Sequence, residues 1–159
     1  MPSTALLALP DTLVPYVRAL ADDPDLWRPH VRFDGDRRHW SRLPTRLDVD
    51  VWLLTWLPDQ GSDLHDHGDA AAALTVVQGT LTEVRADRSG ALSSAQLGAG
   101  ASHWVAPGVV HDIVNRSTQP AVSIHVYAPR LRHMTFWHTE PGALVRGRTV
   151  VTSEPEVAA

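Results

Sequence analysis

The chain has 159 residues, of which 43% are hydrophobic and 20% charged, a composition typical of a single globular domain with a full core. A formal net charge of -4 leaves no basic surface for nucleic acid or an anionic membrane, so neither is expected as a partner. Since the sequence contains neither cysteine nor lysine, disulfides, thiolate nucleophiles, cysteine-based zinc sites and Schiff-base chemistry are excluded.

The first element expected is an amphipathic helix over residues 10–21, because apolar residues such as Leu13 and Val17 recur there at helical spacing. A second short helix is expected around residues 26–31. The apolar run that precedes them lacks a positively charged start and stops at a Pro-Asp pair, so we expect no signal peptide and a cytoplasmic protein. No stretch approaches the length of a membrane span.

Short β-strands separated by turns are expected after about residue 45. The strand-like stretches are DVDVWLLTW, ALTVVQGTLTEVRA, SHWVAPGVVHDIVN, AVSIHVYAP and LVRGRTVVT, and PDQGS and DRSGA read as turns. Strands of this length and spacing favour a mainly β fold, either a small closed barrel or a sandwich. We therefore expect one domain over residues 1–159, with a helical segment at 1–35, a β-barrel at 45–150 and a frayed tail at 152–159.

Two histidines stand one residue apart in the stretch HDHGD. Side chains at positions i and i+2 of a strand point to the same face, so His65 and His67 would both face a barrel interior, as two metal ligands should. The alternative is a pair of exposed or core histidines, since His-x-His is common by chance.

The spacing after these histidines resembles the first of the two motifs of the cupin family, a small β-barrel (double-stranded β-helix or jelly roll) with a metal inside. That motif reads His-x-His, four residues, Glu, six residues, Gly. Gly79 stands at the required distance, but Ala72 occupies the glutamate position.

The second cupin motif reads Gly, five residues, Pro-x-Gly, two residues, His, three residues, Asn. Its positions are matched by Gly100, Gly108, His111 and Asn115, with a proline one place out of register. The resemblance implies that His111 is the third metal ligand.

Without the glutamate of the cupin motif, the ligands would carry no negative charge. Three neutral imidazoles leave a divalent ion with its full double charge, an arrangement suited to zinc hydrolysis or to ferrous iron. It also favours an anionic bidentate substrate that supplies negative charge itself, and a thiolate is one such ligand.

Polar residues align on one face of the stretch PAVSIHVYAP. Ser123, His125 and Tyr127 lie at alternate positions, with apolar residues between them, so a strand here would build a hydrogen-bond relay on its inner face. The alternative is a half-exposed strand whose polar face is in water.

The stretches HDHGD, GTLTE, VVHDIVN and QPAVSIHVYAP together resemble the cysteine dioxygenase family of thiol dioxygenases, from about residue 40 to 127 and more weakly to 150. The resemblance implies a cupin with Fe(II) on the three histidines named above. It also implies a catalytic Ser-His-Tyr relay in which the hydroxyl of Tyr127 touches substrate or oxygen. Animal members carry a cysteine at the Ala72 position, joined by a thioether to the tyrosine, and this chain cannot form that bond.

Members that oxidise cysteine hold the substrate carboxylate with an arginine, and HWSRL resembles that segment, which makes Arg42 the candidate. A guanidinium fork matches a carboxylate with two parallel hydrogen bonds. The match needs a short deletion, so Arg46 is a rival, and a plain surface arginine is the other alternative. Relatives that prefer 3-mercaptopropionate have glutamine in this position, so Arg42 points to cysteine.

Two carboxylates and a histidine near the motifs are not expected to take part in catalysis. Asp69 is expected to accept a hydrogen bond from a ligand imidazole. Glu83 is expected to be solvated or bonded to a turn, and His103 to be structural or exposed.

The hypothesis is an oxidoreductase of cysteine catabolism that uses Fe(II) and O2 to convert L-cysteine to cysteine sulfinic acid, as a monomer or weak homo-oligomer. One alternative is a dioxygenase of another small thiol such as 3-mercaptopropionate. A second is a hydrolase, lyase or isomerase using zinc or manganese, with Tyr127 as acid or base. A third is a sensor that binds a small molecule.

Overall fold

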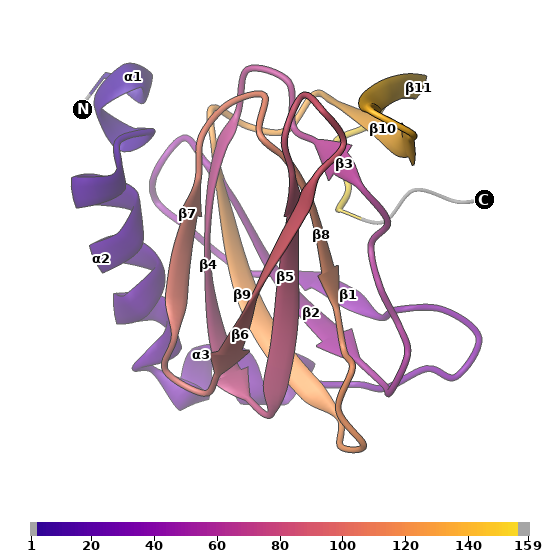
Figure 1. Cartoon of the computed structure of the whole chain (residues 1–159). Helices are drawn as coiled ribbons and strands as arrows, with labels where there is room; N and C mark the ends of the chain where they lie inside the picture. Colours follow the sequence, from indigo (N-terminus) through magenta and orange to yellow (C-terminus); the bar gives the residue numbers. More distant parts are fainter. Residues whose placement is uncertain (1–2, 156–159) are drawn as a thin grey trace.

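The computed structural model describes residues 3–155 and consists of two antiparallel β-sheets that face each other, with helices on the outer side of one sheet (Figure 1). The five-stranded sheet has the order β1 (Trp40–Arg42), β2 (Asp50–Trp56), β9 (Ala121–Ala128), β4 (Ala71–Gln78) and β7 (Ser102–Val105). The six-stranded sheet has the order β11 (Ala143–Val151), β10 (His133–Glu140), β3 (His65–Asp66), β8 (Val110–Val114), β5 (Thr80–Ala86) and β6 (Leu92–Gly98).

The expected mainly β fold is confirmed, and its two-sheet arrangement is consistent with a jelly roll. The expectation of a closed barrel is corrected, because the hydrogen-bonded ladders form two separate sheets. In the described part of the chain, β1 and β7 are the edges of one sheet, and β11 and β6 are the edges of the other. The interior is therefore enclosed by the packing of two faces.

The N-terminal helices are α1 (Thr4–Leu7), α2 (Pro10–Ala21), α3 (Pro24–Trp27) and the 3₁₀ turn η1 (Arg28–His30). α2 spans the residues expected for it. Its first residue is a proline, whose fixed φ suits the first helical turn, and the acidic Asp11 follows where the helix dipole favours negative charge. Leu13 and Val17 are buried on the side that packs against β4 and β9.

Two hydrophobic layers result from this arrangement. The inner layer lies between the sheets and is built from large side chains such as Trp52, Trp56 and Leu74. The outer layer lies between the five-stranded sheet and the helices. β9 separates the two layers, and all its residues are buried, so the alternative of a half-exposed strand is excluded.

The β4–β5 connection turns at Gly79, as expected. Its φ is 75°, and a Cβ at this position would lie 2.6 Å from the carbonyl oxygen of Pro120. Only glycine fits both conditions, because it has no Cβ and adopts positive φ without strain. The turn holds β4 and β5 in different sheets while they remain consecutive in the chain.

The segment after β11 is attached to the molecule, whereas a frayed tail was expected over residues 152–159. The backbone amide of Thr152 donates to the carbonyl of Arg132, and Pro155 is buried. Residues 156–159 lie outside the described part of the chain. In the part that is described, every helix is too short or too polar to cross a bilayer.

Candidate metal centre

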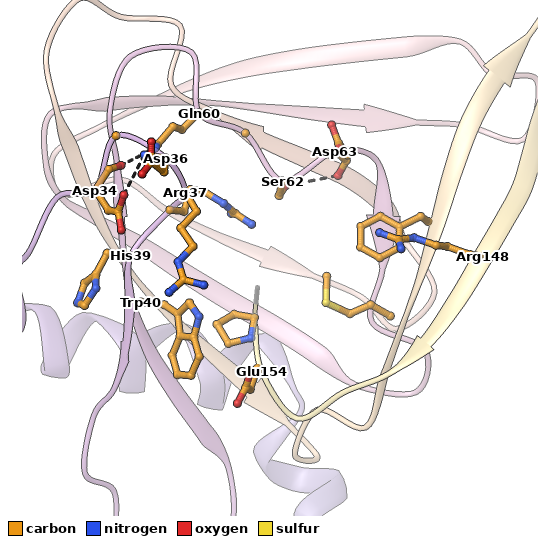
Figure 2. Close-up of a pocket in the computed structure, with 16 residues that line it drawn as sticks. Asp34, Asp36, Arg37, His39, Trp40, Gln60, Ser62, Asp63, Arg148 and Glu154 are labelled. Carbon is orange, nitrogen blue, oxygen red and sulfur yellow. Dashed lines mark hydrogen bonds between the residues drawn. The ribbon is translucent and has the colours of Figure 1, made fainter. Parts of the chain in front are cut away.

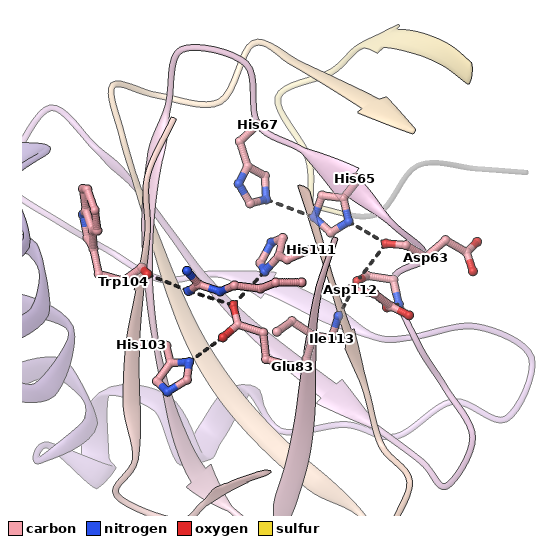
Figure 3. A network of polar contacts seen from close by, with 11 residues as sticks. Asp63, His65, His67, Glu83, His103, Trp104, His111, Asp112 and Ile113 are labelled. Atoms are coloured by element: carbon pink, nitrogen blue, oxygen red, sulfur yellow. Dashed lines mark hydrogen bonds and ion pairs between the residues drawn. The ribbon is translucent and has the colours of Figure 1, made fainter. Parts of the chain in front are cut away.

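Three buried histidines meet between the sheets (Figure 3). His65 lies on β3 and His67 directly after it, while His111 lies on β8, where it is paired with His65 across the strands. Their candidate ligand atoms all lie within 4.8 Å of one another. The structure therefore brings together the residues that were expected to be metal ligands.

Hydrogen bonds on the outer side orient two of these rings. The Nδ1 of His65 lies 2.8 Å from the carbonyl oxygen of Asp63, and the Nδ1 of His111 lies 3.0 Å from Oε1 of Glu83. Because both partners are acceptors, each Nδ1 carries the proton and each Nε2 presents a lone pair to the centre.

The inner nitrogens fit a metal ion. Nε2 of His65 and Nε2 of His67 are 3.0 Å apart, and the buried Nε2 of His111 has no hydrogen-bond partner among the described residues. A buried polar atom without a partner costs free energy, and convergent imidazole nitrogens are ligands for transition metals. A divalent ion at the centre would satisfy all three.

Burial keeps two of these imidazoles, those of His65 and His67, neutral. It lowers the pKa of His65 and of His67 well below the ordinary value, and the neighbouring imidazoles lower it further. Metal ligation requires the neutral form of histidine. The site is therefore ready to bind a cation at neutral pH without first releasing protons from these two rings.

Glu83 is a residue whose role the sequence interpretation missed. The prediction of a solvated carboxylate is wrong, because Glu83 is only 2% exposed and lies between His111 and His103 (Figure 3). Burial alone would raise its pKa, but the hydrogen bonds from the two histidines and the charge of Arg85 outweigh it and lower the pKa to about 2. The available signal was its alternation with Leu81, a core residue on the same strand.

Two further carboxylates lie near the histidines in the sequence. Asp69 is exposed, and the acceptors for the ligand imidazoles are the backbone carbonyl of Asp63 and the carboxylate of Glu83. Asp66 is buried and accepts hydrogen bonds from Nε1 of Trp137 and the amide of Gly68. It thus supports the loop that carries His67.

The polar residues of β9 face the inner layer next to the histidines. Ser123 Oγ is 2.8 Å from Nε2 of His125 and also accepts a hydrogen bond from Nε1 of Trp56. The ring of Tyr127 stacks on His125 at 6.5 Å and meets His67 edge-on at 4.9 Å. The structure therefore links the expected Ser-His-Tyr row to the metal ligands.

The same burial controls the protonation of this row. It lowers the pKa of His125 to about 3, helped by His111 and Arg38. It raises the pKa of Tyr127 well above the usual value for a phenol. At neutral pH the row consists of a neutral imidazole and a neutral phenol that can donate a hydrogen bond.

Arg42 does not reach the histidines. Its side chain is 47% exposed and its guanidinium donates to Asp50 and to the carbonyl of Ser153. Arg46 is also exposed. Arg38 is only 7% exposed, its guanidinium lies over the ring of Trp56, and it lines the inner cavity beside His65 and His111.

A pocket of about 820 Å³ lies between the segment before β1, the loop before β3 and the end of the described chain (Figure 2). Arg38, Ser62 and Pro155 line both this pocket and a narrow inner cavity of about 10 Å³. That inner cavity is also lined by His65, His111, His125 and Tyr127. Arg38 therefore borders both the pocket and the cavity next to the histidines.

The sequence profile of the family described as "Cysteine dioxygenase type I" matches residues 11–139. The match includes nearly all of α2, the strands from β1 to β9, nearly all of β10 and the three histidines, whereas α1 and β11 lie outside it. The chain belongs to this family. Cysteine dioxygenase type 1 from Rattus norvegicus is 30% identical and the Homo sapiens enzyme 28% identical, each over 124 residues. The alignments cover 71% of this chain and 62% of each relative, which is less than two thirds of the relatives' length.

Solved structures agree with the cysteine dioxygenase family fold. A protein with a double-stranded β-helix domain from Klebsiella pneumoniae superposes with a TM-score of 0.56 at 21% identity, over 76% of this chain and 93% of that one. A Thermus thermophilus protein gives 0.57 at 20% identity, over 64% and 92%. At these identities the likeness concerns the fold alone.

Proposed function

We propose that this chain is a thiol dioxygenase with a non-haem Fe(II) centre, and that it converts L-cysteine and O2 to cysteine sulfinic acid. The observation that carries the proposal is the convergence of His65, His67 and His111 in a member of the cysteine dioxygenase family. Ferrous iron would supply open coordination positions for a thiolate and for the activation of dioxygen.

The ligand set suits an anionic substrate. Three imidazoles that each give a lone pair would leave a divalent ion with its double charge, which a thiolate would reduce. Apolar side chains (Leu54, Trp56 and Ile113) line the inner cavity beside the histidines and would exclude water from the reacting sulfur.

Arg38 is proposed to bind the substrate carboxylate, in place of Arg42. Arg38 lines both the pocket and the inner cavity beside the histidines, so its guanidinium is placed to meet the carboxylate of a substrate whose thiol lies at the histidines. The planar guanidinium would hold the carboxylate with two hydrogen bonds and orient the sulfur toward the centre. The ring of Trp56 packs against the guanidinium in a cation–π contact, with Cζ of Arg38 4.5 Å from the ring centroid.

Tyr127 is proposed to donate a hydrogen bond to the reacting sulfur or oxygen. Its high pKa keeps the proton on the phenol, and its ring is held between His67 and His125. Ser123 and Trp56 hold the far side of His125, so the row can keep the tyrosine in a fixed orientation.

The test is oxygen uptake by anaerobically Fe(II)-loaded protein with L-cysteine, 3-mercaptopropionate and cysteamine, each at several concentrations, with the sulfinate quantified. The proposal predicts sulfinate from cysteine, and poor saturation with cysteamine because that thiol lacks a carboxylate. Faster turnover of 3-mercaptopropionate would keep the chemistry and change the substrate. Failure to oxidise any of the three thiols would contradict the proposal.

The size of the pocket favours including other carboxylate thiols in this test. A volume of about 820 Å³ is far larger than cysteine needs, so the pocket alone does not select among small thiols. Selection would come from Arg38 and from the groups that meet the substrate amine. A hydrolase, lyase or isomerase that uses zinc or manganese would instead show no oxygen uptake with these thiols, and metal analysis after purification without added metal would identify its ion.

A further inference from the structure

We propose that Glu83 is the positioning residue of the metal centre: it fixes the His111 ring and places a negative charge directly behind it. The cupin motif would have a glutamate at Ala72, and this chain lacks it. Glu83 supplies a carboxylate from a different strand, and this carboxylate would contact the ligand His111 and not the ion itself. The inference rests on the metal centre of the proposed function and is independent of the substrate.

The contact with His111 is direct and buried. Oε1 of Glu83 lies 3.0 Å from Nδ1 of His111, and both residues are 2% exposed. The two residues come from neighbouring strands, β5 and β8, which are paired along their length. A carboxylate that accepts the Nδ1 proton of a ligand histidine fixes its tautomer and raises the electron density on Nε2.

The carboxylate of Glu83 is itself held by His103 from the opposite sheet and by Arg85 from its own strand. The imidazole of His103, on β7, is hydrogen-bonded to Oε2 of Glu83. Arg85 donates to Oε1 of Glu83 at 3.2 Å and to the carbonyl of Trp104, also on β7, at 2.8 Å (Figure 3). The carboxylate is therefore fixed from both sheets and can hold the imidazole of His111 in one orientation.

The charge of Glu83 also matters for the ion. The three ligands are neutral, so the nearest negative charge in this network lies on Glu83, one imidazole away. Buried charges interact strongly because the surrounding dielectric is low. Glu83 would therefore strengthen cation binding without occupying one of the positions that substrate and oxygen need.

The experiment measures the affinity of the apo protein for Co(II), by competition with a chelator, and the visible spectrum of the Co(II) form. Glu83→Gln keeps the size of the side chain and removes its charge. The predicted loss of affinity is about 10- to 100-fold, the range found when outer partners of ligand histidines are removed. The Co(II) absorption bands should also shift, because the His111 ring is less firmly oriented.

Two reference variants make the result interpretable. Glu140→Gln removes an exposed carboxylate and should leave the affinity unchanged. His111→Ala should abolish tight Co(II) binding; if it does not, the metal centre itself is wrong and not only the role of Glu83. If His111→Ala loses the ion while Glu83→Gln keeps wild-type affinity and spectrum, the inference about Glu83 is overturned.

A further variant covers the case in which Glu83→Gln does not fold. Glu83→Asp retains the charge and withdraws it by one methylene group, so it should bind Co(II) with an affinity between those of the wild type and Glu83→Gln. Far-ultraviolet circular dichroism of each apo variant checks the fold. A wild-type affinity and spectrum in a folded Glu83→Asp protein would also count against the inference.

Discussion

Ala72 lies directly opposite Tyr127 in the pairing of β4 with β9. This is the position where animal members of the family carry the cysteine that is bonded to the tyrosine. The matching register supports the alignment on which the relay residues were predicted. In this chain alanine stands at that position, so Tyr127 remains an unmodified phenol.

Tyr127→Phe removes only this hydroxyl and should leave the ring packed between His67 and His125. We expect Co(II) affinity to remain at the wild-type level, while sulfinate formation at saturating substrate falls by about 100-fold or more, as is typical when a proton donor is lost. Steady-state kinetics of the Fe(II)-loaded variant provide the measurement. An unchanged rate would remove Tyr127 from the proposed chemistry.

Arg38→Gln and Arg42→Gln form a matched pair that tests which arginine binds the carboxylate. Loss of hydrogen bonds to a charged group costs about 1.5–3 kcal/mol, so Arg38→Gln should raise the KM for cysteine by about 10- to 100-fold. The KM for cysteamine should change little. Arg42→Gln should affect neither KM appreciably, because Arg42 is bonded to Asp50 and Ser153; the opposite pattern would restore Arg42 as the substrate-binding residue.

The apo protein should lose stability as the pH falls below about 6.5, the pKa of histidine in an unfolded chain. Burial lowers the folded-state pKa of His125 to about 3 and lowers those of His65 and His67 as well. The unfolded state therefore binds more protons in this range, and the free energy of unfolding decreases by up to about 1.4 kcal/mol per pH unit for each such histidine.

Urea unfolding of the apo protein between pH 7 and pH 4 measures this effect. His125→Asn should show a shallower dependence, because one of the buried imidazoles is gone. A free energy of unfolding that is independent of pH over this range would mean that these histidines are not buried in the neutral form.

The helical layer should contribute to stability without forming part of the metal centre. Leu13, on α2, is 1% exposed and packs on the outer side of the five-stranded sheet. Leu13→Ala should lower the free energy of unfolding by about 2–5 kcal/mol and leave Co(II) affinity unchanged. Leu9→Ala, at a residue that is 49% exposed, is the control and should change stability by less than about 1 kcal/mol.

The periodicity of apolar residues was sufficient to predict some of the helices and strands of this molecule. The apolar spacing of α2 and the alternation of β9 gave the correct elements and faces, because each follows from local geometry. Strands β6 and β10 were not expected. β6, with the sequence LSSAQLG, is exposed and has no β-branched residue, so the usual strand signal is absent.

The roles inferred for Glu83 and Arg38 were not predicted from the sequence, because they depend on contacts between distant segments. Glu83 meets His103 across the two sheets, and no local pattern predicts that contact. Arg38 lies in an irregular segment before β1, where periodicity gives no guide to the direction of the side chain. Arg42 was predicted from the resemblance of HWSRL to a family segment, and this resemblance does not show that Asp50 and Ser153 hold its guanidinium at the surface.

The most direct test of the central claim uses isotopically labelled dioxygen with Fe(II)-loaded protein and L-cysteine, followed by mass spectrometry of the product. The account predicts cysteine sulfinic acid in which both new oxygen atoms come from the labelled gas, and no such product from His111→Ala. Sulfinate whose oxygen atoms come from water, or cystine as the sole product, would contradict a dioxygenase at the three-histidine centre.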